Sequence, residues 1–432
     1  MGLLRAGTIT LASRVVVFLL ALVSSVILAR ALGPSGRGLY ALSILVPSLL
    51  VLAANLGVGN ALTYYLARRT YDPTIVIGQV TSLALILGAV AFVVLIAFLK
   101  LFGSDVLPGV PLYLVLIAGA SLPLALFFYY CLSFTQGMEA FWAFNSLYVT
   151  NSGAIVLFLV PLLFLRGNVT FAVIGWSLSW VPTAILGLYW LSRWGRLNIR
   201  FDPSMARSLL RFGIVGYLSF LTNFFNFRLG TFLVNIFRSP AEVGLYSVAV
   251  VLAETIFYAS TSAATVLAPR VAAADVEAGD LATGRVSRMV LVISLAAAAA
   301  AGAVAPVAIR LLYGPSFQPS VAAVWLLLPG IVTFSVARVL SSYLLGRNKQ
   351  HVDFGAAVTG LVLTVVLDLL LIPRFGFGGA AAASSVAYTS TLLVDLVWVV
   401  RNSKLTAGDL LLPKIEDFQI MLSRARALAR AH

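Results

Sequence analysis

The chain is built from long apolar runs, most of them 20 or more residues in length, separated by short breaks rich in Gly, Pro, Asn and charged residues. A helix needs about 20 apolar residues to cross the hydrocarbon core of a bilayer. The pattern therefore predicts an all-α, polytopic integral membrane protein with about 12 transmembrane helices. The predicted spans are 7–32, 38–67, 74–101, 110–135, 141–165, 169–192, 209–237, 243–268, 286–312, 318–345, 352–372 and 378–400.

Basic residues at the ends of these spans predict the orientation, because cytoplasmic loops carry the excess of Lys and Arg. With the N-terminus assigned to the cytoplasm, 19 of the 29 Lys and Arg residues fall on the inner side and 7 on the outer side. We therefore expect a multi-pass protein with both termini inside. The outer residues are Arg30, Arg37, Lys100, Arg166, Arg238, Arg310 and Arg374.

The two halves of the chain share short patterns at a nearly constant spacing. Gly-Leu-Tyr opens a span at 38–40 and again at 244–246, 206 residues later, and segments 177–193 and 385–401 share Ser, Thr, Trp and Arg at an offset of 208. These matches predict two pseudo-symmetric six-helix lobes related by an axis along the membrane normal, a plan typical of alternating-access transporters. The expected domains are an N-terminal lobe (1–196), a cytoplasmic linker (197–208), a C-terminal lobe (209–402) and a basic amphipathic tail (403–432).

Composition narrows the function. The net charge of +14 is dispersed over helix ends, so we expect no nucleic-acid partner. One cysteine and two histidines make a metal site unexpected, and no phosphate-binding loop is present. The main rival to a transporter is an integral-membrane glycosyltransferase or polymerase. Such an enzyme needs catalytic carboxylates, whereas the predicted outer loops hold two, Asp105 and Glu242.

Three arginines lie within predicted spans: Arg14, Arg228 and Arg338. An arginine inside a bilayer costs at least a few kcal/mol, so it faces a hydrated cavity or a partner. Arg228 is too deep to reach the headgroups, and we expect it either to bind an anionic substrate or to pair with Glu254. Arg14 and Arg338 are shallower, and snorkelling to the inner headgroups is the alternative for both.

Other polar residues within the spans are also candidates. Glu254, in mid-span, is the candidate for coupling to a proton or sodium gradient. Asp368 and Asp395 lie nearer to predicted helix ends, so we expect them to be solvated. Six asparagines could line a path for a hydroxyl-rich ligand or bridge helices: Asn223, Asn226, Asn55, Asn60, Asn145 and Asn151.

Several stretches carry a resemblance to a known family. They are "ILARALGPSGRGLYAL", "RLLYGPSF", "LLGRNK" and "LIPRFGFGGAAAASSVAYT". Over about residues 5–402 the chain resembles the polysaccharide transport family, which includes the Wzx-type O-antigen flippases. That family belongs to the MOP superfamily, with the MATE drug exporters and the MurJ lipid II flippase.

The resemblance implies a MATE/MurJ-like fold, no enzymatic activity and no bound cofactor. It implies movement of an undecaprenyl-pyrophosphate-linked oligosaccharide from the inner to the outer leaflet of a bacterial or archaeal cell membrane. Arg228, helped by Arg14 and Arg338, would then neutralise the pyrophosphate. A lipid II flippase and a MATE-like exporter remain alternatives. The basic inner surface would suit anionic inner-leaflet lipids and polysaccharide-assembly glycosyltransferases or a polymerase as partners.

Overall fold

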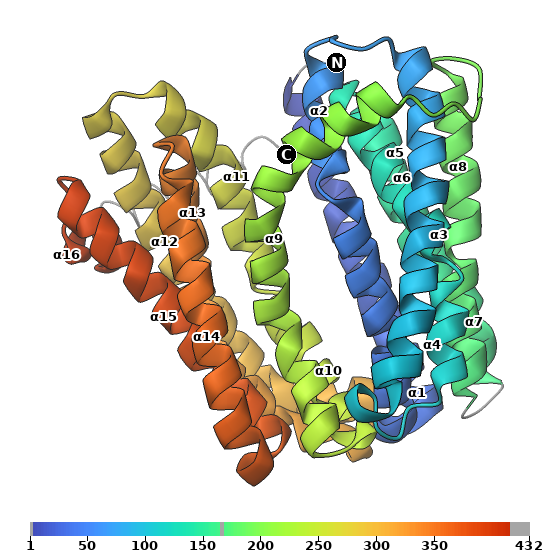
Figure 1. Ribbon diagram of the computed structural model, residues 1–432. Helices are drawn as coiled ribbons and strands as arrows, with labels where there is room; N and C mark the ends of the chain where they lie inside the picture. The colour runs from blue at the N-terminus through green and yellow to red at the C-terminus, as the bar shows by residue number, and fades with distance from the viewer. Residues whose placement is uncertain (1–2, 165–167, 415–432) are drawn as a thin grey trace. The chain divides into compact units, whose positions relative to one another are not determined.

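The computed structural model of the chain describes residues 3–164 and 168–414, except the side chains of 3–8, 11, 162–163, 214–220, 223, 259, 266, 269 and 273. Within these residues the regular structure is helical (Figure 1). The helices of the first half are α1 (Leu3–Asn55), α2 (Val58–Ala67), α3 (Pro73–Val106), α4 (Leu112–Gly119), α5 (Leu122–Gly137), α6 (Phe141–Leu159), η1 (Val160–Leu163), α7 (Val169–Leu178) and α8 (Trp180–Ser192). The second half holds α9 (Pro203–Phe237), α10 (Pro240–Glu254), α11 (Phe257–Ala273), α12 (Val276–Ala308), η2 (Ile309–Tyr313), η3 (Pro315–Phe317), α13 (Ser320–Gly346), α14 (Gln350–Phe375), α15 (Phe377–Asn402) and α16 (Ala407–Leu411).

Apart from at most two residues at an end, every predicted span lies within one helix or within a pair of consecutive helices. Among the described residues, eight helices are long and apolar enough to cross a membrane, or nine if the bent pair α4 and α5 forms one span. The prediction of an all-α, multi-pass membrane protein is therefore confirmed, and a total of about twelve spans is consistent with it.

Several spans are interrupted. α1 contains two predicted spans that join at Gly33, whose φ of 67° and ψ of −179° are not helical. Such a backbone conformation is accessible almost exclusively to glycine. The predicted span at 38–67 is broken after Asn55, where α1 ends and α2 begins. The predicted span at 243–268 is broken after Glu254, between α10 and α11. A polar residue thus ends the first helix at each break.

The long helices begin at residues suited to a helix start. Asp72 caps α3 by accepting a hydrogen bond from the Thr74 backbone, with Pro73 in the first turn. Asp275 caps α12 in the same way, accepting from the backbone of Ala278. An N-cap carboxylate satisfies one of the amide groups that a helix leaves free at its start, and proline fits there because it lacks that amide.

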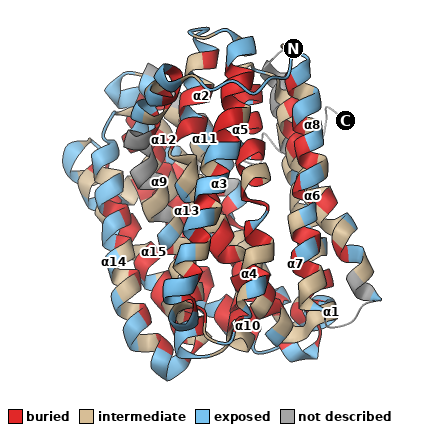
Figure 2. Cartoon of the chain, turned by 45° about the vertical axis from the view of Figure 1, so that its right-hand side comes forward, coloured by how far each residue is buried: buried red, intermediate tan, exposed pale blue. Residues whose placement is uncertain are grey.

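Contacts divide the chain into two compact units. Unit 1 comprises Met1–Leu221, Arg238–Gly244 and Leu312–Ser316, and unit 2 comprises Thr222–Phe237, Leu245–Leu311 and Phe317–His432. In unit 1, α1 packs on α6 and α5 packs on both α2 and α3; in unit 2, α15 packs on α13 and α14. Buried and exposed residues alternate along the same helices (Figure 2). The lobe boundaries drawn from the sequence stay predictions.

The C-terminal segment is described as far as residue 414. Its short helix α16 packs against α12. The predicted amphipathic helix of the tail falls on residues 415–432, which lie outside the described residues.

The internal duplication is visible at one close backbone contact inside unit 1. A Cβ added to Gly38 would lie 1.6 Å from the carbonyl oxygen of Pro240, and one added to Gly244 would lie 1.9 Å from that of Pro34. Gly244 and Pro240 each stand 206 residues after Gly38 and Pro34. The contact is therefore reciprocal, as at an interface between two symmetric copies. The offset found in the sequence is thus reproduced in space.

Candidate functional site

Arg228 and Glu254 face each other in unit 2. Arg228 is carried by α9 and Glu254 is the last residue of α10, and their Nη2 and Oε2 atoms lie 3.6 Å apart. The side chains are 36% and 28% exposed, so the pair is only partly covered by protein. Of the two expectations for Arg228, the ion pair is therefore formed in this structure, and about a third of the Arg228 side chain stays exposed.

Arg338, on α13, is held in the same unit by different partners. Its Nη1 donates a 2.6 Å hydrogen bond to the Thr261 hydroxyl, and its guanidinium lies 4.6 Å from the ring centre of Phe257. Arginine stacked on an aromatic face gains a cation–π attraction and keeps its fork of donors. Arg338 is thus anchored on α11.

A cluster of aromatic rings lies beside Arg338. Phe227, Phe257, Phe334 and Tyr388 form a connected cluster with ring centres 5.0–6.0 Å apart. The Arg338 guanidinium also lies 5.5 Å from the ring centre of Phe334. The rings come from α9, α11, α13 and α15, so four helices fix the position of the charges.

The two arginines differ in their partners. Glu254 forms an ion pair with Arg228, whereas Arg338 makes no ion pair among the described residues and donates to Thr261 instead. Guanidinium groups match phosphate and carboxylate oxygens in a bidentate manner.

The predicted asparagines have mostly structural contacts. Asn226 accepts a 2.6 Å hydrogen bond from Thr364, joining α9 to α14. Asn145 donates 3.0 Å to Thr10 and joins α6 to α1. Asn151 donates to Thr183 of α8 at 3.5 Å. Of their two expected roles, these three show helix bridging.

The remaining predicted polar residues lie on unit 1 or outside the described side chains. Asn55 accepts from the Gly59 backbone at 3.2 Å and thereby supports the start of α2. Arg14 stacks over Tyr148 of α6, 4.6 Å from its ring centre. Asn60 is exposed and lines a pocket. The side chain of Asn223 lies outside the described residues.

The prediction that Asp368 and Asp395 are solvated is wrong. Asp368 and Asp395 are 0% exposed, and neither has a hydrogen-bond partner for its carboxylate oxygens among the described residues. The helices continue well past them, to Phe375 and Asn402, which places both carboxylates inside their bundle. A buried carboxyl group without a partner is costly and marks a position with a purpose beyond packing.

Arg37 also differs from its expected place in an outer loop. Its side chain is 5% exposed and donates to the Ser25 carbonyl and hydroxyl at 2.6 and 3.0 Å. The sequence "GPSGRG" predicts a turn, but the single non-helical residue Gly33 makes the bend and helix resumes at Pro34. Arg37 therefore lies on a buried helical turn.

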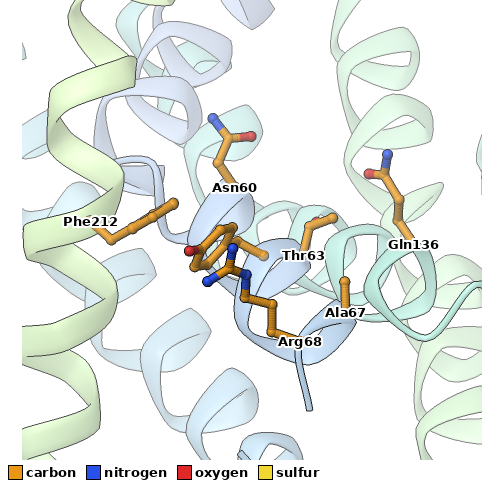
Figure 3. Close-up of a pocket in the computed structure, with 7 residues that line it drawn as sticks. Asn60, Thr63, Ala67, Arg68, Gln136 and Phe212 are labelled. Atoms are coloured by element: carbon orange, nitrogen blue, oxygen red, sulfur yellow. The ribbon is translucent and has the colours of Figure 1, made fainter. Parts of the chain in front are cut away.

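Unit 1 also contains a pocket that the sequence indicated only through Asn60. It has a volume of about 540 Å³ and lies among α2, α5 and the first part of α9 (Figure 3). Its lining residues are Asn60, Thr63, Tyr64, Ala67, Arg68, Gln136 and Phe212. Thr63, Tyr64, Ala67 and Arg68 follow Asn60 within eight residues, but they were missed because Gln136 and Phe212, which complete the pocket, are distant in sequence.

Comparisons with known proteins agree with this architecture. The profile of the family described as "Polysaccharide biosynthesis protein" matches residues 3–274. A comparison with curated proteins finds no significant sequence match.

Solved structures of MOP superfamily proteins share the fold. The lipid II flippase MurJ in an inward closed conformation is similar with a TM-score of 0.79 and 14% identity, covering 94% of this chain and 89% of that one. An inward-facing MATE multidrug resistance transporter is similar with a TM-score of 0.72 and 19% identity, covering 88% of this chain and 93% of that one. A MOP superfamily transporter from Pyrococcus furiosus is similar with a TM-score of 0.61 and 18% identity, covering 91% of this chain and 94% of that one. With its family profile matched over more than half its length, the chain belongs to the polysaccharide biosynthesis protein family.

Proposed function

We propose that this chain is a transporter that moves an undecaprenyl-pyrophosphate-linked oligosaccharide from the cytoplasmic to the outer leaflet by alternating access. Membership of a polysaccharide biosynthesis family and the fold shared with a lipid II flippase support this assignment. The observation that carries it is the cluster of Arg228, Glu254 and Arg338 in unit 2, in which Arg228 is paired with a partly exposed carboxylate and Arg338 has no ion pair among the described residues.

The chemistry of the cluster suits a pyrophosphate. Arg228 keeps 36% of its side chain accessible and is held at 3.6 Å from Glu254, longer than a close hydrogen-bonded pair. An incoming diphosphate could therefore take over the guanidinium donors from the carboxylate. Glu254 would be released by the same event, and a proton or sodium ion could then compensate its charge. This exchange would couple substrate binding to an ion gradient.

Binding of a short-chain polyprenyl-pyrophosphate sugar to purified protein in nanodiscs tests the proposal. Arg228→Ala should weaken binding by roughly tenfold or more, because a hydrogen bond to a charged group contributes about 1.5–3 kcal/mol. Arg228→Lys should retain part of the affinity. Glu254→Gln should strengthen binding several-fold, because it removes the carboxylate that competes with the substrate.

The matched control is Arg238→Ala. Arg238 follows the same helix and is paired with Glu242 at 3.1 Å, so its loss removes one paired arginine without touching the cluster. Unchanged affinity in Arg228→Ala, with unchanged affinity in Glu254→Gln, would make the pair purely structural and refute the proposal. Thermal stability measured on the same samples separates lost binding from lost folding.

A further inference from the structure

The pocket of unit 1 has one aromatic wall. Tyr64 on α2 and Phe212 on α9 are stacked with ring centres 4.5 Å apart and planes inclined by 26°. Both remain exposed, at 37% and 40%. The guanidinium of the exposed Arg68 lies over the ring of Tyr64, 4.7 Å from its centre, so a cation is stacked on this wall. Figure 3 shows Phe212 on α9 and Arg68 on the helix that carries Asn60.

The opposite side of the pocket is polar. The side-chain amides of Asn60 on α2 and Gln136 on α5 have no hydrogen-bond partner among the described residues. Thr63 donates to the Ser133 carbonyl at 3.1 Å and keeps acceptor capacity toward the pocket. Arg68 makes no ion pair within the described part of the chain. The pocket thus presents two amides, a hydroxyl and a cation.

The walls are fixed rather than adaptable. α2 and α5 approach so closely that a Cβ on Gly59 would lie 2.7 Å from the Ser133 hydroxyl oxygen, and one on Gly137 would lie 2.8 Å from the Cβ of Leu66. Pockets that bind small ligands have volumes of about 300–1,000 Å³ and a few well-placed polar groups. This pocket, of about 540 Å³, falls within that volume range and is open on one side.

Membrane proteins often place tyrosines at the headgroup level, where the ring is apolar and the hydroxyl is wet. That role would account for Tyr64 alone. It does not require a second ring stacked on it from another helix, nor two amides from α2 and α5 that face the same space. The arrangement instead combines the groups that recognise a sugar: rings for its C–H face, amides for its hydroxyls and a cation for an acidic substituent.

The geometry points to a second binding site, in which Tyr64, Phe212, Arg68, Asn60 and Gln136 hold an acidic sugar unit. The inference rests on the proposed function, because the sugar would belong to the glycan of the lipid-linked substrate. In the orientation predicted from the sequence, Arg68 lies at the cytoplasmic end of its span. The pocket would then receive the glycan on the side where the substrate is made.

Ligand-observed NMR titrations with soluble D-glucuronate and methyl β-glucoside test this site, on full-length protein in nanodiscs of phosphatidylcholine. Wild type should bind both sugars, glucuronate more tightly. Arg68→Gln should weaken glucuronate binding roughly tenfold and leave the glucoside unaffected. Phe212→Ala should weaken both. Arg69→Gln is the matched control, since it removes the adjacent cation, which does not line the pocket.

The possible outcomes are distinct. Equal effects of Arg68→Gln and Arg69→Gln, or no glucuronate binding by wild type, would overturn the inference. In a further arm, phosphatidylglycerol added to the nanodiscs offers the same anion and hydroxyls as a lipid headgroup. If it binds through Arg68 and glucuronate does not, the pocket is a lipid site and the inference falls. The pyrophosphate titration on the same samples reports on the proposed function separately, because it depends on Arg228.

Discussion

At the scale of single residues, we expect close backbone contacts to matter for the stability of the folded protein. Gly38 is the clearest case, because the Cβ of any other residue would meet the Pro240 carbonyl oxygen at 1.6 Å. The nearest real contacts of a Cβ are about twice that distance. Polypeptide backbones on both sides of the contact would have to separate, and there is no flexible side chain to yield.

Gly38→Ala should therefore destabilise the protein by more than about 3 kcal/mol, at the upper end of overpacking effects. Gly153→Ala on α6 is the matched control, since a Cβ there meets nothing within 4 Å. It should leave stability unchanged or raise it by up to about 1 kcal/mol, as alanine favours helix. Thermal unfolding in detergent measures both. A Gly38→Ala protein as stable as the Gly153→Ala protein would show that the contact does not hold in the membrane.

At the scale of helices, α16 shows how a short element is fixed outside the spans. Thr406 and Asp409 form a reciprocal capping box, and Lys414 donates to the Asp409 carboxylate at 2.8 Å. Hydrogen bonds from Lys414 and Thr406 hold the pKa of Asp409 well below its usual value. Arg288 of α12 donates to the Asp409 carbonyl, which joins α16 to the bundle.

This arrangement predicts acid sensitivity of α16. Because the pKa is lowered in the folded state, the stabilisation is fully present above the ordinary aspartate pKa of about 3.9 and is lost as pH falls below it. Amide hydrogen exchange of residues 406–411, corrected for the intrinsic pH dependence, should accelerate in that range. Asp409→Asn should show fast exchange already at neutral pH and little further change on acidification. An acid response as large as that of wild type would assign the effect to another group.

At the scale of the whole molecule, the duplication extends to matching turns within each unit. α5 ends at Gly137, whose Cβ would lie 2.8 Å from the Cβ of Leu66, and α13 ends at Gly346, whose Cβ would lie 2.9 Å from the Ala268 carbonyl oxygen. Each turn then has a non-glycine residue with positive φ, Glu139 at 55° and Asn348 at 58°. Each half therefore has a closely packed glycine at the end of a helix, followed two residues later by a residue with positive φ.

Equivalent substitutions should consequently have equivalent effects. Gly137→Ala and Gly346→Ala should each cost roughly 1–3 kcal/mol, because each crowds a helix pair in its own unit. The two positions share no neighbour, so the double variant should show the sum to within about 0.5 kcal/mol. Thermal unfolding of the two single variants and the double variant checks this. A large effect of one glycine beside no effect of the other would limit the duplication to backbone topology.

The sequence alone predicts the helical, multi-pass architecture, because burial in lipid requires a continuous apolar run of fixed length for each span. It also determined the duplication, through Gly-Leu-Tyr at 38–40 and 244–246, and it singled out Arg228 and Glu254 as intramembrane charges. These features are local or repeat along the chain, so they can be read without coordinates.

Which residues contact one another depends on the tertiary structure. Arg37 was expected in a loop and is buried, because a single glycine bends the chain and the helix resumes. Asp368 and Asp395 were expected to be solvated and are buried, because distance from a helix end does not determine which side of a helix is covered. The pocket joins Tyr64 to Phe212 and Gln136, residues on three helices. Contacts between positions so far apart depend on how helices pack, which the apolar pattern of each helix alone does not specify.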